Sequence, residues 1–92
     1  MEAGKMKEIR RKIGTVRKQM AKIGPVMRGT VVVIGTRNKQ PYFSLNKDKK
    51  THLIYLGKRR EPMAREYSEN YRKLLDLVEE MTVLNMKLLK KL

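Results

Sequence analysis

The chain has 92 residues and a formal net charge of +14, from 23 Lys and Arg against nine Asp and Glu. It contains no cysteine, which excludes a disulfide framework and a thiolate zinc site. The length fits a single domain, residues 1–92, with a modest core. No apolar run approaches the roughly 18–20 residues of a membrane span, and residues 1–11 lack the apolar core of a signal peptide. We therefore expect a cytoplasmic, nucleoid-associated protein with no membrane partner.

The positive charge is concentrated in the first two thirds of the chain. Residues 1–58 hold fifteen Lys and Arg against three acids, whereas residues 59–92 hold eight against six. Solubility alone needs only a modest charge of either sign, and a concentrated excess costs self-repulsion. The distribution therefore predicts a polyanionic partner, with nucleic acid as the first candidate.

Apolar residues at spacings of three and four predict a first helix within residues 1–23, from about Glu2 to Lys22. We expect Gly24 and Pro25 to end this helix, because glycine accepts a left-handed stop and proline cannot continue the hydrogen-bond ladder. The spacing places six residues along one stripe of the helix: Met6, Ile9, Ile13, Val16, Met20 and Ile23.

Three β-strands are predicted within residues 29–57. β-branched and aromatic residues dominate residues 30–34, 42–45 and 51–56. The connections, residues 35–41 and 46–50, are short enough for hairpins, so we expect an antiparallel meander. Gly57 should end the third strand and with it the sheet.

A long second helix is predicted over residues 62–92. Pro62 suits the first helical position, and Glu61 suits the positive N-terminal end of a helix. From Tyr67 to Leu92 a broad apolar stripe carries two or three residues per turn. At 1.5 Å per residue this helix would run roughly 45 Å, against roughly 30 Å for the first helix. An antiparallel pair of the two helices would then leave apolar surface near the C-terminus.

That uncovered surface predicts a homodimer. Asn85 lies within the apolar stripe, where it either fixes register and oligomeric state or marks the end of burial, and the sequence leaves both interpretations open. The residues expected at the interface are Leu77, Met81, Leu84, Asn85, Leu88 and Leu92.

Together these elements predict an α+β fold. Its parts are an N-terminal helix, a three-stranded antiparallel meander and a long C-terminal helix that pairs with the first helix. We expect the sheet to pack at one end of the helix pair.

Three segments carry a resemblance to known proteins: MRGT (27–30), PYFSLNKDKKTHLIYLGK (41–58) and ENYRKLLDLVEEMTVLN (69–85). They resemble the patterns MRGTL, GPYYYLS…GKT and NYRRL…EE of a family of small, uncharacterised bacterial and phage proteins associated with mobile elements. The resemblance implies a scaffold of helix, sheet and helix. Members of that family usually carry a cysteine cluster between the first two strands, but residues 35–40 of this chain have none, which argues against a metal site.

A shorter stretch combines an aromatic strand, a charged turn and a strand that ends in YLGK (55–58). It is similar to the arm-binding domains of tyrosine recombinases, whose three-stranded sheet enters the DNA major groove. This similarity implies that the sheet contacts DNA.

Basic residues cluster at the predicted turns and at the exit from the sheet. A two-stranded ribbon fits the roughly 12 Å wide major groove, so basic turns could reach phosphates. The alternative is that these turns are simply polar, but only Asp48 offsets their charge. The predicted contacts in this region are Arg28, Arg37, Lys39, Lys47, Lys49, Lys50, Lys58, Arg59 and Arg60.

The predicted first helix also carries a basic face, on which we expect nucleic-acid contacts from Arg10, Arg11 and Lys18. Three interpretations of this face remain open. It could lie along a phosphate backbone, pair with acidic residues of the second helix or bind anionic lipid.

No catalytic constellation is evident. His52 is the only histidine, and no second His or Cys is available to share a metal. Tyr42, Phe43 and Tyr55 could stack on single strands, but aromatic residues of a covered sheet are more commonly core. We therefore expect no enzymatic activity, no cofactor, no metal and no small-molecule substrate.

The predicted function is non-enzymatic binding of nucleic acid, DNA in preference to RNA, through the sheet turns and the basic helix face. Two alternatives remain open: a coiled-coil structural adaptor that docks an acidic protein partner, and an RNA-binding protein.

Overall fold

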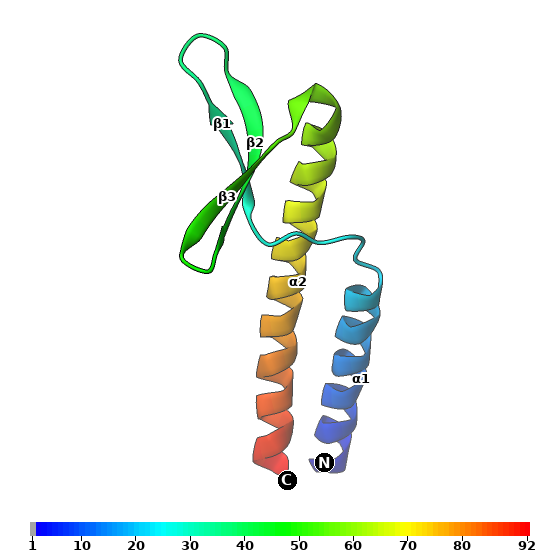
Figure 1. Cartoon of the computed structure of the whole chain (residues 1–92). Coiled ribbons are helices and arrows are strands. Elements are labelled where there is room, and N and C mark those ends of the chain that lie inside the picture. The colour runs from blue at the N-terminus through cyan, green and yellow to red at the C-terminus, as the bar shows by residue number, and fades with distance from the viewer. Residues whose placement is uncertain (1) are drawn as a thin grey trace. The chain divides into compact units, whose positions relative to one another are not determined.

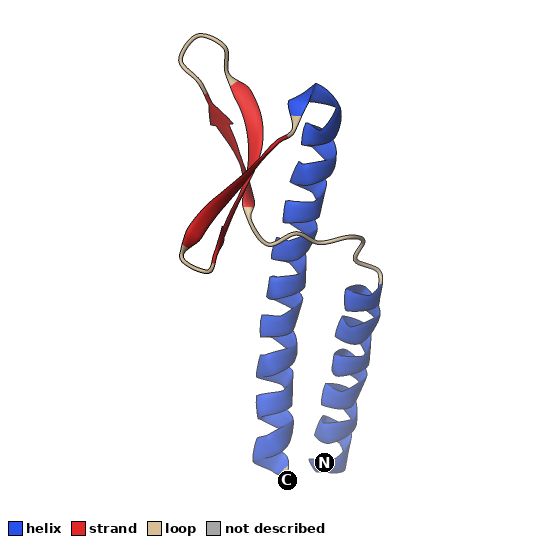
Figure 2. Ribbon diagram, viewed as in Figure 1, coloured by secondary structure: helices blue, strands red, loops and turns tan. Residues whose placement is uncertain are grey.

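A computed structural model describes the backbone of residues 2–92 and the side chains of residues 4–92. The elements follow in the order α1 (Glu2–Ala21), β1 (Thr30–Ile34), β2 (Gln40–Lys47), β3 (Lys50–Tyr55) and α2 (Gly57–Lys91) (Figures 1 and 2). This order confirms the predicted α+β class and the antiparallel sheet.

The chain forms two compact units. Unit 1 joins α1 to Lys73–Leu92, and unit 2 comprises Gly24–Arg72. Because α2 contributes to both units, the single-domain assignment stays a prediction.

α1 agrees with its predicted range to within one residue, but it ends differently from the expectation. The last turn tightens, with the Lys22 and Ile23 amides each donating to a carbonyl three residues earlier, both at 3.2 Å. Gly24 does not adopt a positive φ, so the predicted left-handed stop at this residue is wrong. The tightened turn satisfies part of the helix end without it.

In unit 1, α1 packs against the C-terminal part of α2 through the predicted apolar stripe. Val16 is only 2% exposed and Leu84 only 8% exposed, so these two residues form the buried centre of the pair. The beginning of α1 and the end of α2 lie at the same end of this pair (Figure 1). The helices are therefore antiparallel, and α1 covers the last turns of α2.

This arrangement overturns the argument for a dimer interface on the main apolar stripe of α2. The expected interface requires α1 to cover the beginning of α2 and leave its end bare, whereas α1 lies along that end. Four of the six expected interface residues are buried or half-buried within the single chain: Leu77, Met81, Leu84 and Leu88. Only Asn85 and Leu92 of that set are exposed.

Unit 2 contains the three-stranded sheet, in the order β1-β2-β3 with both pairs antiparallel. Tyr42 of β2 pairs with Val32 on one side and with Tyr55 on the other, and Phe43 pairs with Val31 and Ile54. Because successive side chains of a strand point to opposite faces, this register fixes which residues of the three strands share a face.

One face of the sheet packs against the first turns of α2. Phe43, Leu56 and Ala64 form the buried cluster, with Met27, Val31 and Leu45 packed against it. The segment before β1 is held to the same helix by three hydrogen bonds. The Met27 amide donates to the Tyr67 carbonyl at 3.1 Å, Ser68 Oγ donates to the Gly29 carbonyl at 3.2 Å, and Asn70 Nδ2 donates to the Pro25 carbonyl at 2.9 Å.

α2 begins five residues before Pro62, so the predicted start of the second helix is wrong. Gly57 has a φ of 69°, which lets the chain turn from β3 directly into the helix. Pro62 therefore lies inside the helix, where it lacks an amide for the fourth preceding carbonyl. Glu61 does not cap the start of the helix but pairs with Arg65 one turn later, at 2.7 Å. The early start makes β3 and α2 nearly continuous.

Gly29 should tolerate no side chain. Its φ is 136°, and a Cβ there would lie 2.6 Å from the Ser44 carbonyl oxygen and 2.7 Å from the Phe43 ring. We expect Gly29→Ala to destabilise unit 2 by about 2–4 kcal/mol through backbone strain and overpacking. Tyrosine fluorescence during urea unfolding measures this loss, because all four tyrosines lie within residues 24–72.

The matched control is Gly14→Ala in α1, where a Cβ would meet nothing within 4 Å. It should raise helix stability by up to about 1 kcal/mol. Equal stability of Gly29→Ala and the unmodified protein would show that Gly29 does not constrain unit 2.

Candidate nucleic-acid interface

The sheet has an inner face, which packs on α2, and an outer face on the opposite side. The inner face includes Val31, Phe43 and Leu45. By strand alternation and register, the outer face carries no charged side chain. It consists of Thr30, Val32, Ile34, Gln40, Tyr42, Ser44, Asn46, Thr51, Leu53 and Tyr55.

Local contacts order several side chains of the outer face. The rings of Tyr42 and Tyr55 meet edge to face, with centroids 5.6 Å apart. The Tyr55 hydroxyl donates to Gln40 Oε1 at 3.1 Å, and Thr51 Oγ1 donates to Asn46 Oδ1 at 2.8 Å. These contacts hold the polar groups in fixed positions and leave further donors and acceptors exposed.

The β2–β3 turn carries the densest group of cations. Asp48 and Lys49 have φ values of 54° and 63°, which define a two-residue hairpin turn with positive φ at both positions. Lys47 and Lys50 pair directly on either side of this turn. Arg28 joins them, because its Nη1 donates to the Asn46 carbonyl at 3.1 Å. The structure thus brings four predicted contact residues together at this end of the sheet.

The opposite end of the sheet holds a second group of cations. Arg37 and Lys39 are exposed in the β1–β2 connection, and Lys58 and Arg59 are exposed at the start of α2, immediately after β3. Figure 2 shows the two hairpin turns at opposite ends of the sheet. At about 3.3 Å per residue, the eight residues of β2 separate the two groups by roughly 26 Å.

Arg60 differs from its neighbours because its guanidinium is engaged within the chain. Nε donates to the Leu56 carbonyl at 3.0 Å, and Nη2 donates to the Tyr55 carbonyl at 2.5 Å. Both bonds stabilise the passage from β3 into α2. Arg60 therefore has a structural role that the sequence did not indicate.

The three predicted contacts on α1 belong to unit 1, whereas the sheet belongs to unit 2. Arg10 and Lys18 are exposed, and Arg11 Nη2 lies 3.9 Å from Glu8 Oε1. Such an exposed pair contributes little to stability, so Arg11 stays available to an anion.

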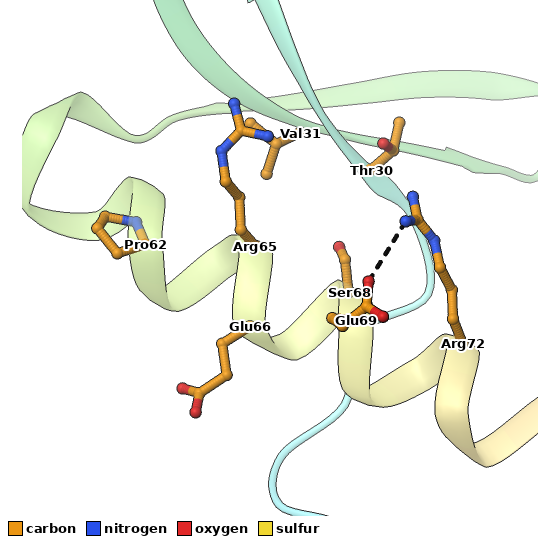
Figure 3. Close-up of a pocket in the computed structure, with 8 residues that line it drawn as sticks. All are labelled: Thr30, Val31, Pro62, Arg65, Glu66, Ser68, Glu69 and Arg72. Atoms are coloured by element: carbon orange, nitrogen blue, oxygen red, sulfur yellow. Dashed lines mark hydrogen bonds and ion pairs between the residues drawn. The ribbon is translucent and has the colours of Figure 1, made fainter.

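Sequence reasoning missed two arginines beside β1. Arg65 and Arg72 lie two helical turns apart on α2 and line a groove that also includes Thr30, Val31 and Ser68 (Figure 3). Each is paired with an acid of the same helix, Arg65 with Glu61 at 2.7 Å and Arg72 with Glu69 at 3.5 Å. The seven-residue spacing of Arg65 and Arg72 could have indicated this groove, because it places both side chains on one face of a helix.

The polar residues of the outer face were also missed by sequence reasoning, although their signal was present. The alternation of Tyr42, Ser44 and Asn46 with Phe43 and Leu45 marks a strand with one buried face and one solvated face. Sequence reasoning treated the aromatic residues as a group and did not separate the two faces. Phe43 is core, as expected, but Tyr42 and Tyr55 lie on the outer face.

His52 lies on the exposed strand β3, opposite Leu45. Among the residues whose side chains the structure describes, no three His, Asp or Glu residues gather in a way that could hold a metal ion. No helix in residues 2–92 combines the length and hydropathy needed to cross a membrane.

Comparison with models of known protein families, with curated proteins and with solved structures gives no significant match.

Lys49 should limit the stability of the hairpin, because a residue other than Gly, Asn or Asp is strained at its φ of 63°. We expect Lys49→Gly to raise the stability of unit 2 by about 0.5–1 kcal/mol, since relief of strain exceeds the added flexibility of the unfolded chain. Urea unfolding followed by tyrosine fluorescence measures the change. Lys39→Gly removes the same charge at a residue without positive φ and should give no gain, so an equal gain in both variants would contradict this account.

Proposed function

We propose that the protein binds nucleic acid without catalysis, and that its ligand is duplex DNA in preference to RNA. One observation carries the proposal. The outer face of the sheet bears no charge and presents polar and aromatic side chains, and exposed lysines and arginines lie at both ends of the sheet. Uncharged polar groups suit base edges, whereas cations suit the phosphates on either side.

The dimensions of the sheet support this ligand. Three strands about 4.8 Å apart span about 10 Å of backbone, which fits a major groove about 12 Å wide. With the strands along the groove, the two cation groups would reach phosphates at either end of the contact. The deep, narrow major groove of A-form RNA would not admit the sheet, which is the physical reason to favour DNA.

The acids of the chain do not compete for the sheet cations through any contact described here. Glu61, Glu69 and Glu8 pair with basic residues of their own helices. On the sheet and its turns only Asp48 is acidic. The positive potential of the sheet is thus left for an external polyanion.

A direct test is an electrophoretic mobility shift with duplex DNA, single-stranded DNA and RNA of matched length, in protein freed of co-purifying nucleic acid. Duplex DNA should bind most tightly. A stronger shift with RNA would instead favour an RNA-binding protein, and no shift with any of the three would favour an adaptor for an acidic protein.

Removing the cations of the β2–β3 turn should weaken binding. Changing Lys47, Lys49 and Lys50 to Ala should reduce affinity for duplex DNA at least tenfold, or about 1.4 kcal/mol, because three phosphate contacts are lost at once. Fluorescence anisotropy with a labelled duplex measures the change.

The matched control changes three exposed lysines of unit 1, Lys7, Lys73 and Lys87, to Ala and so removes the same net charge. It should reduce affinity by much less. If both triple variants lose affinity equally, total charge and not the sheet end is responsible.

Binding should also depend steeply on salt. Eight exposed cations lie at the two ends of the sheet, and if about six of them neutralise phosphates, log K should fall against log salt with a slope of about −5. Titrations between about 50 and about 300 mM NaCl measure the slope. Constant affinity over this range would refute an electrostatic contact.

A further inference from the structure

α2 has a second apolar face in unit 1, beside the face that packs on α1. The inward face contains Leu77, Leu84 and Leu88, which are buried or half-buried. At about 100° per residue, five further residues lie within about 80° of arc, centred roughly 120° around the helix from the inward face. They are Leu75, Val78, Thr82, Met86 and Leu89, and all five are exposed.

This second face is large for a single chain to leave in water. Its four apolar side chains are 48%, 43%, 53% and 69% exposed, in chain order. A helix that packs on one partner needs one apolar stripe about 100° wide, whereas the apolar arc of α2 is about twice as wide. Arcs of this width are typical of helices that contact two neighbours in a bundle.

α1 has no comparable face. None of the exposed large apolar residues in the described part of the chain belongs to α1, whose outward positions are mainly Lys and Arg. Within residues 4–23 and 73–92 of unit 1, Val16 and Leu84 are the only buried apolar residues, so this core is thin. Two helices form a single layer, and a second layer is needed to close a core.

We propose that this second face of α2 binds the same face of a second copy of the chain. The two α2 helices would lie antiparallel, and the two α1–α2 pairs would form a four-helix bundle. The proposal concerns unit 1 alone, so it stands or falls independently of nucleic-acid binding by the sheet.

The sequence of the face is self-complementary in this orientation. Leu75, Thr82 and Leu89 recur every seven residues, and Val78, Asn85 and Leu92 recur three residues after them. A two-fold axis between residues 83 and 84 sets Leu75 opposite the partner's Leu92 and Val78 opposite the partner's Leu89. It also sets Thr82 opposite the partner's Asn85, so that polar meets polar. A shift of one heptad would set Leu75 against the partner's Asn85.

Thr82 is compatible with a buried position in this face. Its Oγ1 donates to the Val78 carbonyl at 2.7 Å, so the hydroxyl proton already has an acceptor. The Asn85 amide has no such bond within the described contacts, and the partner's Thr82 hydroxyl would offer it an acceptor.

Charge favours the antiparallel over the parallel orientation. The first part of this segment is acidic, with Asp76, Glu79 and Glu80, and its end is basic, with Lys87, Lys90 and Lys91. Antiparallel helices set the acidic stretch of each copy beside the basic stretch of the other, whereas parallel helices would set like beside like. Glu79 and the partner's Lys90 lie on the same flank of the interface in this register.

The first experiment measures self-association by sedimentation equilibrium from about 1 to about 100 µM. The unmodified protein should be dimeric in the upper part of this range, and Met86→Glu should weaken dimerisation at least about tenfold by burying a charge. Met63→Glu is the matched control, because Met63 lies on the same helix in unit 2 and is likewise 53% exposed. Far-ultraviolet circular dichroism should show equal helix content in all three proteins.

A monomer at about 100 µM, or equal weakening by both variants, would overturn the proposal. So would a monomer that binds anionic vesicles through Met86, because the face would then serve a lipid surface.

A second experiment tests the orientation. The chain has no cysteine, so Val78→Cys and Leu89→Cys each introduce a single thiol. On oxidation of an equimolar mixture, the antiparallel register should give mainly the mixed disulfide between residues 78 and 89. Predominant disulfides between identical chains would indicate parallel helices and overturn the antiparallel bundle.

Discussion

The close approach of Gly29 to β2 is the constraint on which unit 2 depends. At this point the backbone passes so near the Ser44 carbonyl and the Phe43 ring that no Cβ fits, and Ser68 holds the Gly29 carbonyl from the side of α2. The contact places β1 beside β2 and seats Phe43 against Ala64. Once Phe43 points toward α2, strand alternation sends Tyr42 and Ser44 to the opposite face. The outer face is therefore a consequence of how this short segment is anchored.

The distribution of charge has a similarly local origin. The basic residues of the sheet lie at its ends, because the turns and the exit into α2 are the positions where long cationic side chains stay hydrated. Acids of α2 pair with arginines three or four residues away, which the helix geometry makes easy. Each exposed pair contributes little to stability. Their combined effect is to keep the negative charge of the chain on the helices and away from the sheet.

α2 combines two demands in one helix. Its first turns bury Ala64 against the sheet, and its later turns bury Leu84 in the pair with α1. Neither contact uses the face that contains Leu75 and Met86. The apolar arc in the C-terminal part of α2 is wider than packing on α1 alone can cover.

The sequence by itself determined the elements of this protein, their order and the residues of α1 that point inward. These features depend on periods of 3.6 and 2 residues, which are local.

Tertiary structure alone decided three other features. α2 starts at Gly57 because the anchoring of β3 requires an immediate turn. α1 covers the end of α2, and not its beginning, because the intervening chain sets where the helices meet. The face of the sheet left to solvent is fixed by Phe43 packing on Ala64. Each of these depends on contacts between residues distant in sequence, which no local pattern specifies.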